Sequence, residues 1–158
     1  MTPAVTARAV TEGSLGAWLV KASPGSLPIE ELVRTGFAGI TSRCVRPTYR
    51  TGLVQPDQPV LLWVSGNDRR HPAGIYACGH TTGPVDLAAP SPEMPVRLRA
   101  IDPVIHREEI LDYPTLAGIE VVRMPAGSNP SYLDEEQYHA LQQAFPQARG
   151  VQHLGWNP

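Results

Sequence analysis

The chain has 158 residues, of which 42% are hydrophobic and 18% charged, and its formal net charge at pH 7 is −2. This length supports one domain with its own core and is too short for two, and the slightly acidic balance argues against strong non-specific binding to nucleic acid. No apolar run approaches the length of a membrane span, and residues 1–13 lack the apolar block of a signal peptide. We therefore expect a cytoplasmic protein with no membrane segment.

The N-terminal part of the chain predicts a tail, a strand and a helix. Residues 1–13 have no hydrophobic periodicity and are expected to form a flexible N-terminal tail. Residues 17–22 alternate between two faces, which is typical of a strand, and a Pro-Gly pair follows them. Residues 26–36 then predict a helix, with Ser26 as N-cap and Gly36 at its C-terminal end.

The clearest pattern in the chain lies between residues 59 and 80. Two apolar runs, 60–65 and 74–78, are separated by a loop of Gly, Asn, Asp, Arg and Pro, which predicts a β-hairpin. Both faces of this hairpin carry apolar side chains, so both faces should be covered. Such a strand pair, ending in a polar loop beside Trp63, suits the mouth of a small barrel that admits a planar ligand. The alternative is that Trp63 is simply a core residue.

The remaining segments are shorter and more irregular. Residues 37–57 predict a long loop or a short strand, and the proline-rich residues 81–95 predict a surface connection. Residues 96–101 alternate as a half-exposed antiparallel strand does, with Arg97 and Arg99 pointing outward. These two arginines either contact phosphates or are ordinary solvated side chains.

The C-terminal third predicts two helices around one more strand. Residues 106–118 read as a short helix stopped by a proline, and residues 119–124 as an apolar strand. Residues 134–145 predict a helix that begins with a capping box, and residues 147–158 a peripheral tail. Short strands, a few helices and many Gly and Pro residues indicate an α+β domain built on a small, strongly bent sheet.

Two groups of side chains suggest chemistry, but their spacing does not support it. His71, Cys78 and His80 lack the paired spacing of a zinc site, so we expect no metal and no cofactor. Asp68 and the two histidines, near Ser65, allow a hydrolytic site to be drawn, but the sequence has no GxSxG elbow and no phosphate-binding glycine loop. The sequence therefore favours a protein that is not an enzyme, with hydrolysis as a weaker alternative.

Several segments, taken in order, resemble a known family. AWLVKASP, PIEELV, FAGITSR, VLLWVSGN, AGIYACGHTTGPV and SNPSYLDEEQYHAL resemble, in sequence and spacing, the EVE domain of the PUA-like superfamily, which is related to the YTH and ASCH domains. The resemblance covers about residues 17–145, and it implies one such domain over residues 14–146. It also implies a pseudobarrel of about five mainly antiparallel strands flanked by two or three helices.

The resemblance further implies a function and a set of site residues. Members of the family bind modified bases of the 5-methylcytosine type, flipped from DNA, or modified RNA, and have no known chemistry of their own. The expected base-pocket residues are Trp18, Lys21, Ser23, Thr41, Ser42, Trp63, Ser65, Gly66, Asn67, Ser128 and Asn129. Many members have Arg-Asn where this chain has Thr41-Ser42, which removes a large donor from the expected pocket edge.

The residue types in this set match what a flipped base requires. Stacking needs an aromatic face, the base edge needs amides or hydroxyls, and the flanking phosphates need cations. If Trp63 provides the stacking face, replacing it with alanine is expected to abolish base binding and leave the domain folded. The expected edge-reading residues are Asn67, Ser65 and Ser42, and the expected phosphate ligands are Arg43, Arg46, Arg69 and Arg70. The same cavity could instead serve a small-molecule or protein partner.

Overall fold

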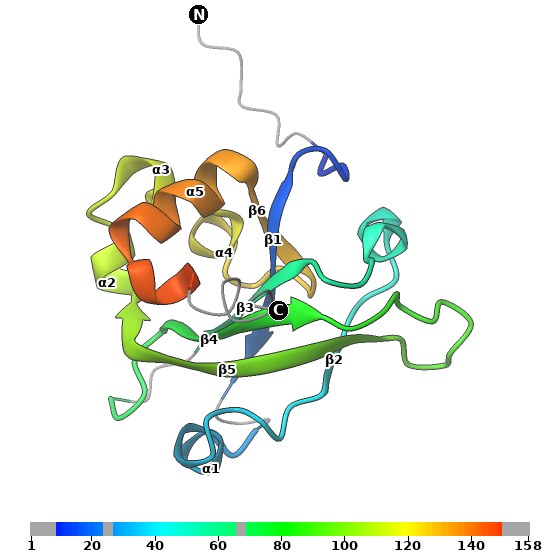
Figure 1. The fold of residues 1–158 in the computed structure, drawn as a ribbon, viewed down its shortest axis with the longest axis horizontal. Helices are drawn as coiled ribbons and strands as arrows, with labels where there is room; N and C mark the ends of the chain where they lie inside the picture. The colour runs from blue at the N-terminus through cyan, green and yellow to red at the C-terminus, as the bar shows by residue number, and fades with distance from the viewer. Residues whose placement is uncertain (1–8, 24–26, 66–68, 150–158) are drawn as a thin grey trace, which may run out of the picture.

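The computed structural model describes residues 9–23, 27–65 and 69–149 (Figure 1). Most of the described chain is organised around one sheet, with helices gathered at its two ends. The elements are, in order, β1 (Leu15–Ala22), α1 (Ile29–Arg34), β2 (Ser42–Cys44), η1 (Tyr49–Leu53), β3 (Pro59–Val64), β4 (Gly74–Thr81), β5 (Glu93–His106), α2 (Arg107–Ile110), α3 (Pro114–Ala117), α4 (Glu120–Arg123), β6 (Ser131–Asp134), α5 (Glu135–Ala144) and η2 (Pro146–Arg149).

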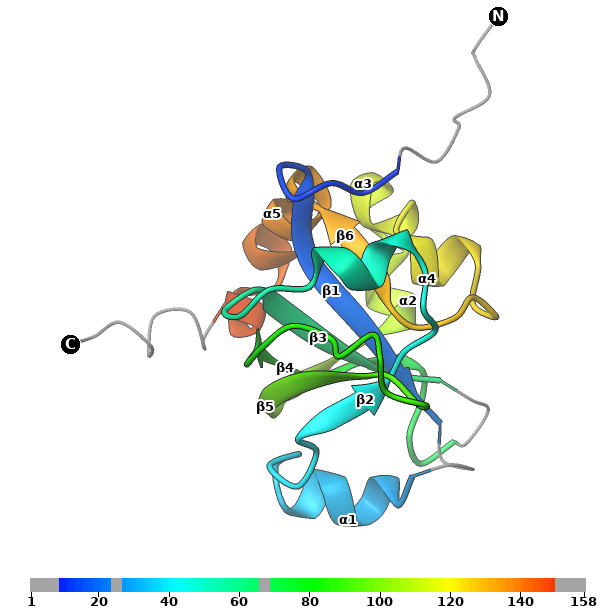
Figure 2. The same ribbon diagram turned by 90° about the vertical axis from the view of Figure 1, so that its right-hand side faces the viewer.

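The sheet has six strands in the order β2-β5-β4-β3-β1-β6. Only the pairing of β1 with β3 is parallel among the described strand pairs, and the other neighbours are antiparallel. The predicted hairpin is present as β3 and β4, with Leu61 opposite Cys78. The two views show the sheet curling into a half-barrel (Figures 1 and 2). The predicted α+β class and mainly antiparallel sheet are thus confirmed, with one strand more than the expected five.

Both faces of the sheet are covered, as the apolar hairpin predicted. On one face Trp18 and Val20 of β1 pack with Leu62 of β3. On the other face Leu19 and Trp63 pack with residues from α2 to α5. Figure 1 shows these four helices together at one end of the sheet, with α1 at the opposite end. The alternation along β1 and β3 therefore assigns the two tryptophans to opposite faces.

One predicted strand is instead a helix. Residues 119–124 contain α4, in which the N–H of Met124 donates to the carbonyl of Glu120 at 2.7 Å. A short apolar run has no period that separates a strand from a buried turn of helix. The edge beside β1 is taken by β6, where Trp18 pairs with Tyr132, so residues 119–124 are free to pack Ile119 and Val121 into the core.

The packed chain extends past the boundaries expected for the domain. Val10, within the expected tail of residues 1–13, is buried, and its N–H donates to the hydroxyl of Tyr49 at 3.0 Å. At the other end, Ala148 of η2 is buried beside the helical layer. Among the described residues, no helix has both the length and the apolar character needed to cross a membrane.

Candidate functional site

Asn129 ties together segments that are far apart in the sequence. Its Oδ1 accepts from the N–H of Lys21 at 2.8 Å, and its Nδ2 donates to the carbonyl oxygens of Lys21 at 3.3 Å and Cys44 at 3.4 Å. The guanidinium of Arg43 donates to the same Lys21 carbonyl at 3.0 Å, and the N–H of Arg46 donates to the carbonyl of Asn129 at 2.9 Å. The structure therefore brings together Lys21, Arg43, Arg46 and Asn129, all of which were predicted as site residues.

The side chain of Lys21 is used to hold the loop before β6. Its Nζ donates to the carbonyl of Pro125 at 3.1 Å and to the carbonyl of Gly127. Burial lowers the pKa of this ammonium group, and the negative charge of Glu120 opposes that effect. Because two of its three N–H donors are used inside the protein, Lys21 mainly stabilises the loop before β6.

Next to this cluster lies a groove of about 400 Å³, here called the Asn129 groove. Two apolar side chains on its walls are unusually exposed for their size, with 54% exposure for Tyr49 and 56% for Met124. The groove lies between η1 and the segment from α4 to β6, and its residues are Arg46, Thr48, Tyr49, Arg50, Glu120, Met124, Gly127, Ser128, Asn129 and Pro130. It combines an aromatic wall, a hydroxyl group and cations.

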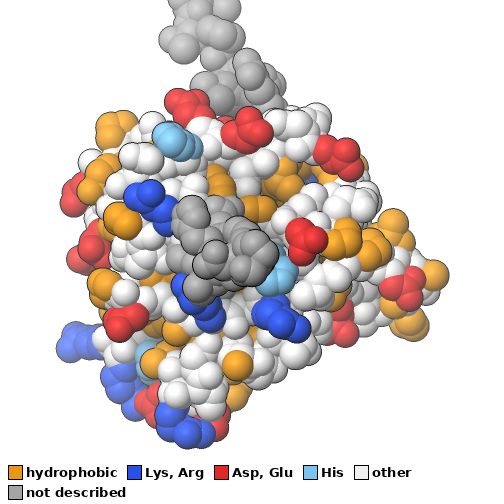
Figure 3. Space-filling view, viewed as in Figure 1, with side chains coloured by type: hydrophobic (Ala, Val, Ile, Leu, Met, Phe, Trp, Pro, Cys, Tyr) orange, Lys and Arg blue, Asp and Glu red, His pale blue; other side chains and the backbone are white. Residues whose placement is uncertain are grey.

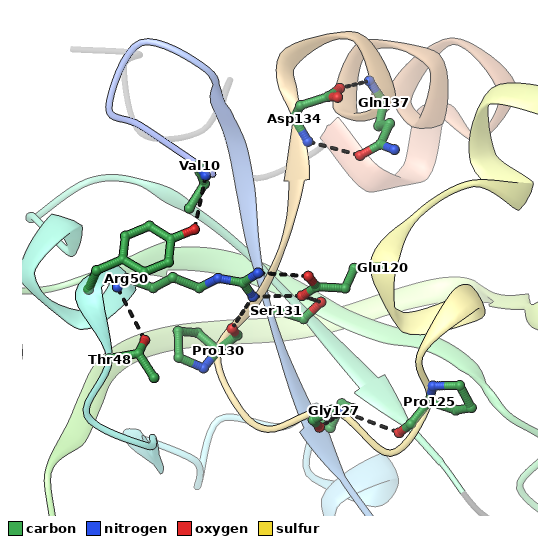
Figure 4. Close-up of polar contacts among 12 residues, drawn as sticks. Val10, Thr48, Arg50, Glu120, Pro125, Gly127, Pro130, Ser131, Asp134 and Gln137 are labelled. Atoms are coloured by element: carbon green, nitrogen blue, oxygen red, sulfur yellow. Dashed lines mark hydrogen bonds and ion pairs between the residues drawn. The ribbon is translucent and has the colours of Figure 1, made fainter. Parts of the chain in front are cut away.

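A half-buried ion pair forms part of the groove (Figure 4). The guanidinium of Arg50 donates to both carboxylate oxygens of Glu120, at 2.6 and 2.7 Å, and to the carbonyl of Pro130 at 3.0 Å. Ser131 Oγ also donates to Glu120 at 2.8 Å, and the ring of Tyr132 lies 4.9 Å from the centre of the guanidinium. This fork geometry makes the pair a fixed, nearly neutral part of the groove.

The pKa values of the pair follow from these contacts. Burial by itself would raise the pKa of Glu120, but hydrogen bonds from Arg50 and Ser131 and the charge of Arg50 hold that pKa below its usual value. The hydrogen bond to Glu120 raises the pKa of Arg50, despite the opposing effect of burial. Both groups are therefore charged at neutral pH.

This ion pair predicts a pH-dependent contribution to stability. Because the pKa of Glu120 is depressed in the folded state, its contribution is present above the usual value of 4.5 and is lost as the pH falls through the lower folded-state pKa. Glu120→Gln should therefore cost about 2 kcal/mol at pH 7. Urea unfolding at several pH values measures this, and the difference in the free energy of unfolding between the wild type and the variant should become smaller below pH 4.5. A difference that stays constant down to acid pH would contradict a stabilising role of the charged Glu120.

Neither predicted pocket tryptophan reaches the groove. The exposed fractions of Trp18 and Trp63 are 0% and 2%, and their side chains lie in separate core clusters. Trp18 also donates from its indole N–H to the side chain of Gln58 at 2.7 Å. Since a stacked base needs an open ring face, the alternative interpretation of Trp63 as a core residue fits the structure.

The smaller predicted pocket residues are divided between internal contacts and the surface. Ser65 Oγ donates to the carbonyl of Ala22 at 3.3 Å, and Ser42 Oγ donates to Glu93 at 2.6 Å. Thr41 is exposed, Ser23 is half-buried, and Ser128 is exposed in the groove. Gly66 and Asn67, together with Asp68, lie outside the described residues.

The predicted phosphate ligands separate into two places. Arg46 is exposed in the Asn129 groove, with a long contact of 3.5 Å to Ser128 Oγ, and Arg43 is directed to Lys21. Arg69 and Arg70 are exposed on the connection between β3 and β4, where Arg70 forms an ion pair with Glu30 of α1 at 2.8 Å. Only Arg46 of these four is at the groove with an uncommitted charge.

Sequence reasoning missed Tyr49, Arg50 and Glu120 as groove residues. Glu120 was missed because residues 119–124 were predicted as a strand. A strand pattern does not show that Glu120 pairs with Arg50. One sequence feature could have indicated the helical turn that carries Tyr49 and Arg50, namely the capping box of Thr48 and Thr51 at the start of η1. This feature predicts η1 but does not show that η1 faces the loop before β6.

The comparisons with known proteins concern the fold. No family model matches the sequence, and no curated protein matches it. The structure is similar to Rpa0253 from Rhodopseudomonas palustris, with 12% identity over 84% of this chain and 94% of that chain and a TM-score of 0.62. It is also similar to a hypothetical protein from Leishmania major, with 15% identity, coverage of 87% and 99%, and a TM-score of 0.59.

A third similar structure is human THYN1 in complex with 5-methylcytosine containing DNA. The identity is 13%, the match covers 81% of this chain and 96% of that chain, and the TM-score is 0.56. At these identities the similarity shows the fold alone. The predicted α+β class, with a curled and mainly antiparallel sheet, is confirmed, and the resemblance to the EVE family stays a prediction.

Proposed function

We propose that this protein is a non-catalytic module that binds nucleic acid, with a base entering the Asn129 groove. The observation that carries the proposal is the groove itself. It sets the exposed ring of Tyr49 beside the exposed charge of Arg46 and the hydroxyl of Ser128. These are the groups that stacking, phosphate contact and base-edge recognition require.

The rigidity of the groove supports the same function. Tyr49 follows a capping box at its backbone and accepts a hydrogen bond at its hydroxyl from Val10, so an exposed ring is held at both ends. The loop opposite is held by Lys21 and Asn129. A platform that is already ordered loses little entropy when a ligand stacks on it.

The finer part of the proposal concerns the base. The similar fold of THYN1 was solved with DNA that contains 5-methylcytosine. The groove volume of about 400 Å³ lies in the range of pockets that hold small organic ligands. We therefore propose a modified base of the 5-methylcytosine type, flipped from DNA or presented by RNA, as the ligand of the groove.

Replacing Tyr49 with alanine tests the stacking role. Stacking contributes about 1 to 3 kcal/mol per base, so Tyr49→Ala should weaken binding by roughly 5- to 150-fold. Fluorescence anisotropy with short DNA and RNA oligonucleotides that carry one cytosine, 5-methylcytosine or 5-hydroxymethylcytosine measures this. Tyr113→Ala removes another exposed tyrosine ring that does not line the groove, so it is the matched control and should leave binding unchanged.

Three results would count against the proposal in different ways. Equal affinity for all three bases would show that the protein does not recognise the modification. Equal losses of affinity in the Tyr49 and Tyr113 variants would show that the base does not bind in the groove. An absence of binding to every oligonucleotide at low salt would overturn nucleic-acid binding and favour a small-molecule or protein ligand.

A further inference from the structure

Most cations near the Asn129 groove are engaged inside the protein. Lys21 and Arg43 donate to backbone carbonyls, and Arg50 is bound to Glu120. This leaves Arg46 as the uncommitted cation of the groove in the described chain. Because phosphate contacts supply a large share of nucleic-acid affinity, a module with one available arginine at its base site needs cations elsewhere.

The outer side of β5 offers such cations. Arg97 and Arg99 are exposed there, and within the described residues neither has a hydrogen-bond or ion-pair partner. Two other exposed arginines differ, since Arg34 of α1 is paired with Glu31, and Arg70 of the β3–β4 connection is paired with Glu30. Among the described residues, Arg97 and Arg99 are thus two unpaired charges that lie two positions apart on one strand.

The register of the sheet explains why these side chains face solvent. Val96 and Leu98 of β5 are buried in the core cluster around Trp18, so the alternation of the strand sends Arg97 and Arg99 to the opposite side. Their partners on β4 are His80, opposite Arg97, and Cys78, opposite Arg99, and neither is acidic. Glu93, at the start of β5, accepts a hydrogen bond from Ser42.

We infer that the outer side of β5 is a second nucleic-acid contact, in which Arg97 and Arg99 bind backbone phosphates. Two arginines on one side of a strand are about 7 Å apart along it, and each guanidinium can bind a phosphate through two N–H groups. In Figure 3 most of the visible Lys and Arg side chains lie in the lower half of the face, with Asp and Glu side chains among them. The inference rests on the proposed nucleic-acid partner but not on the groove or on the modified base.

The experiment measures how affinity for an unmodified DNA duplex depends on salt. Each phosphate contact contributes about 0.9 to the slope of log affinity against log salt concentration, so Arg97→Ala with Arg99→Ala should make the slope shallower by about 1.8. The control replaces Arg34 and Arg107 with alanine, which removes the same charge from exposed positions on α1 and α2. This control should leave the slope unchanged. Replacing Arg97 and Arg99 with lysine keeps the charges and should also preserve it.

The readouts separate this inference from the proposed function. If the Arg97 and Arg99 double variant changes the slope no more than the control does, the second contact is overturned. The ratio of affinities for duplexes with 5-methylcytosine and cytosine reports the groove, and the double variant should leave that ratio unchanged. Binding with no base preference, together with a shallower salt slope in the double variant, would overturn the proposed base recognition and support the β5 contact. A wild-type protein that binds no duplex at low salt would overturn both.

Discussion

Replacing Trp63 with alanine is expected to lower the free energy of unfolding by about 3 to 5 kcal/mol. The indole is 2% exposed and packs among Leu61, Ile75 and the helical layer, so its removal leaves a cavity that the sheet cannot fill. Urea unfolding followed by circular dichroism measures the loss. For a domain of ordinary stability, such a loss removes a large part of the total.

The same experiment decides between the two interpretations of Trp63. Trp63→Phe keeps most of the ring volume and should cost less than the alanine variant. Leu87→Ala, at an exposed position, should change stability by no more than about 0.5 kcal/mol. If Trp63→Ala remains as stable as the wild type and loses only nucleic-acid binding, the core assignment is wrong and the base stacks on Trp63.

The hairpin of β3 and β4 was predictable because its signal is local. Alternation of two apolar runs and a polar loop between them depend only on neighbouring residues, and the capping box of Asp134 and Gln137 before α5 is equally local. That both faces would be covered also followed from the pattern. The pattern could not show which side of the sheet faces a ligand, so Trp63 fitted a pocket and a core equally well.

The candidate site was harder to predict because its contacts span the chain. The resemblance to a family singled out Lys21 and Asn129, and the need for phosphate ligands singled out Arg46. The structure brings these three residues together. The partner of Arg50 could not be found in this way, since Glu120 is 70 residues further on in a segment that reads as a strand. Long-range ion pairs leave no periodic trace in a sequence.

The charge pattern shows the same limit. The sequence identified Arg97 and Arg99 as outward-facing, and both are exposed. It could not show that Lys21 and Arg50 are committed to internal partners, because the carbonyls of the loop before β6 and the carboxylate of Glu120 meet them only in the fold. Whether a cation is available to bind a phosphate therefore depends on its contacts in the folded protein. Those contacts decide which arginines are candidates for phosphate binding.

Replacing Gly79 with alanine is expected to have an effect comparable to the loss of Trp63. Gly79 lies in the middle of β4, with Val60 of β3 on one side and Leu98 of β5 on the other. A Cβ at this position would overlap the carbonyl oxygen of Arg97, which is backbone and cannot rotate away. The sheet would have to separate β4 from β5, so we expect a loss of about 3 kcal/mol or more in the free energy of unfolding.

Gly39→Ala is the matched control for this prediction. A Cβ at Gly39 meets nothing within 4 Å, and its backbone does not require glycine. This variant should change stability by no more than about 0.5 kcal/mol, or stabilise slightly by restricting the unfolded chain. Equal stability of the two variants would mean that β4 and β5 do not approach as closely as described. The same register pairs Gly79 with Leu98 and His80 with Arg97, so the described surroundings of the inferred phosphate contact on β5 would be wrong as well.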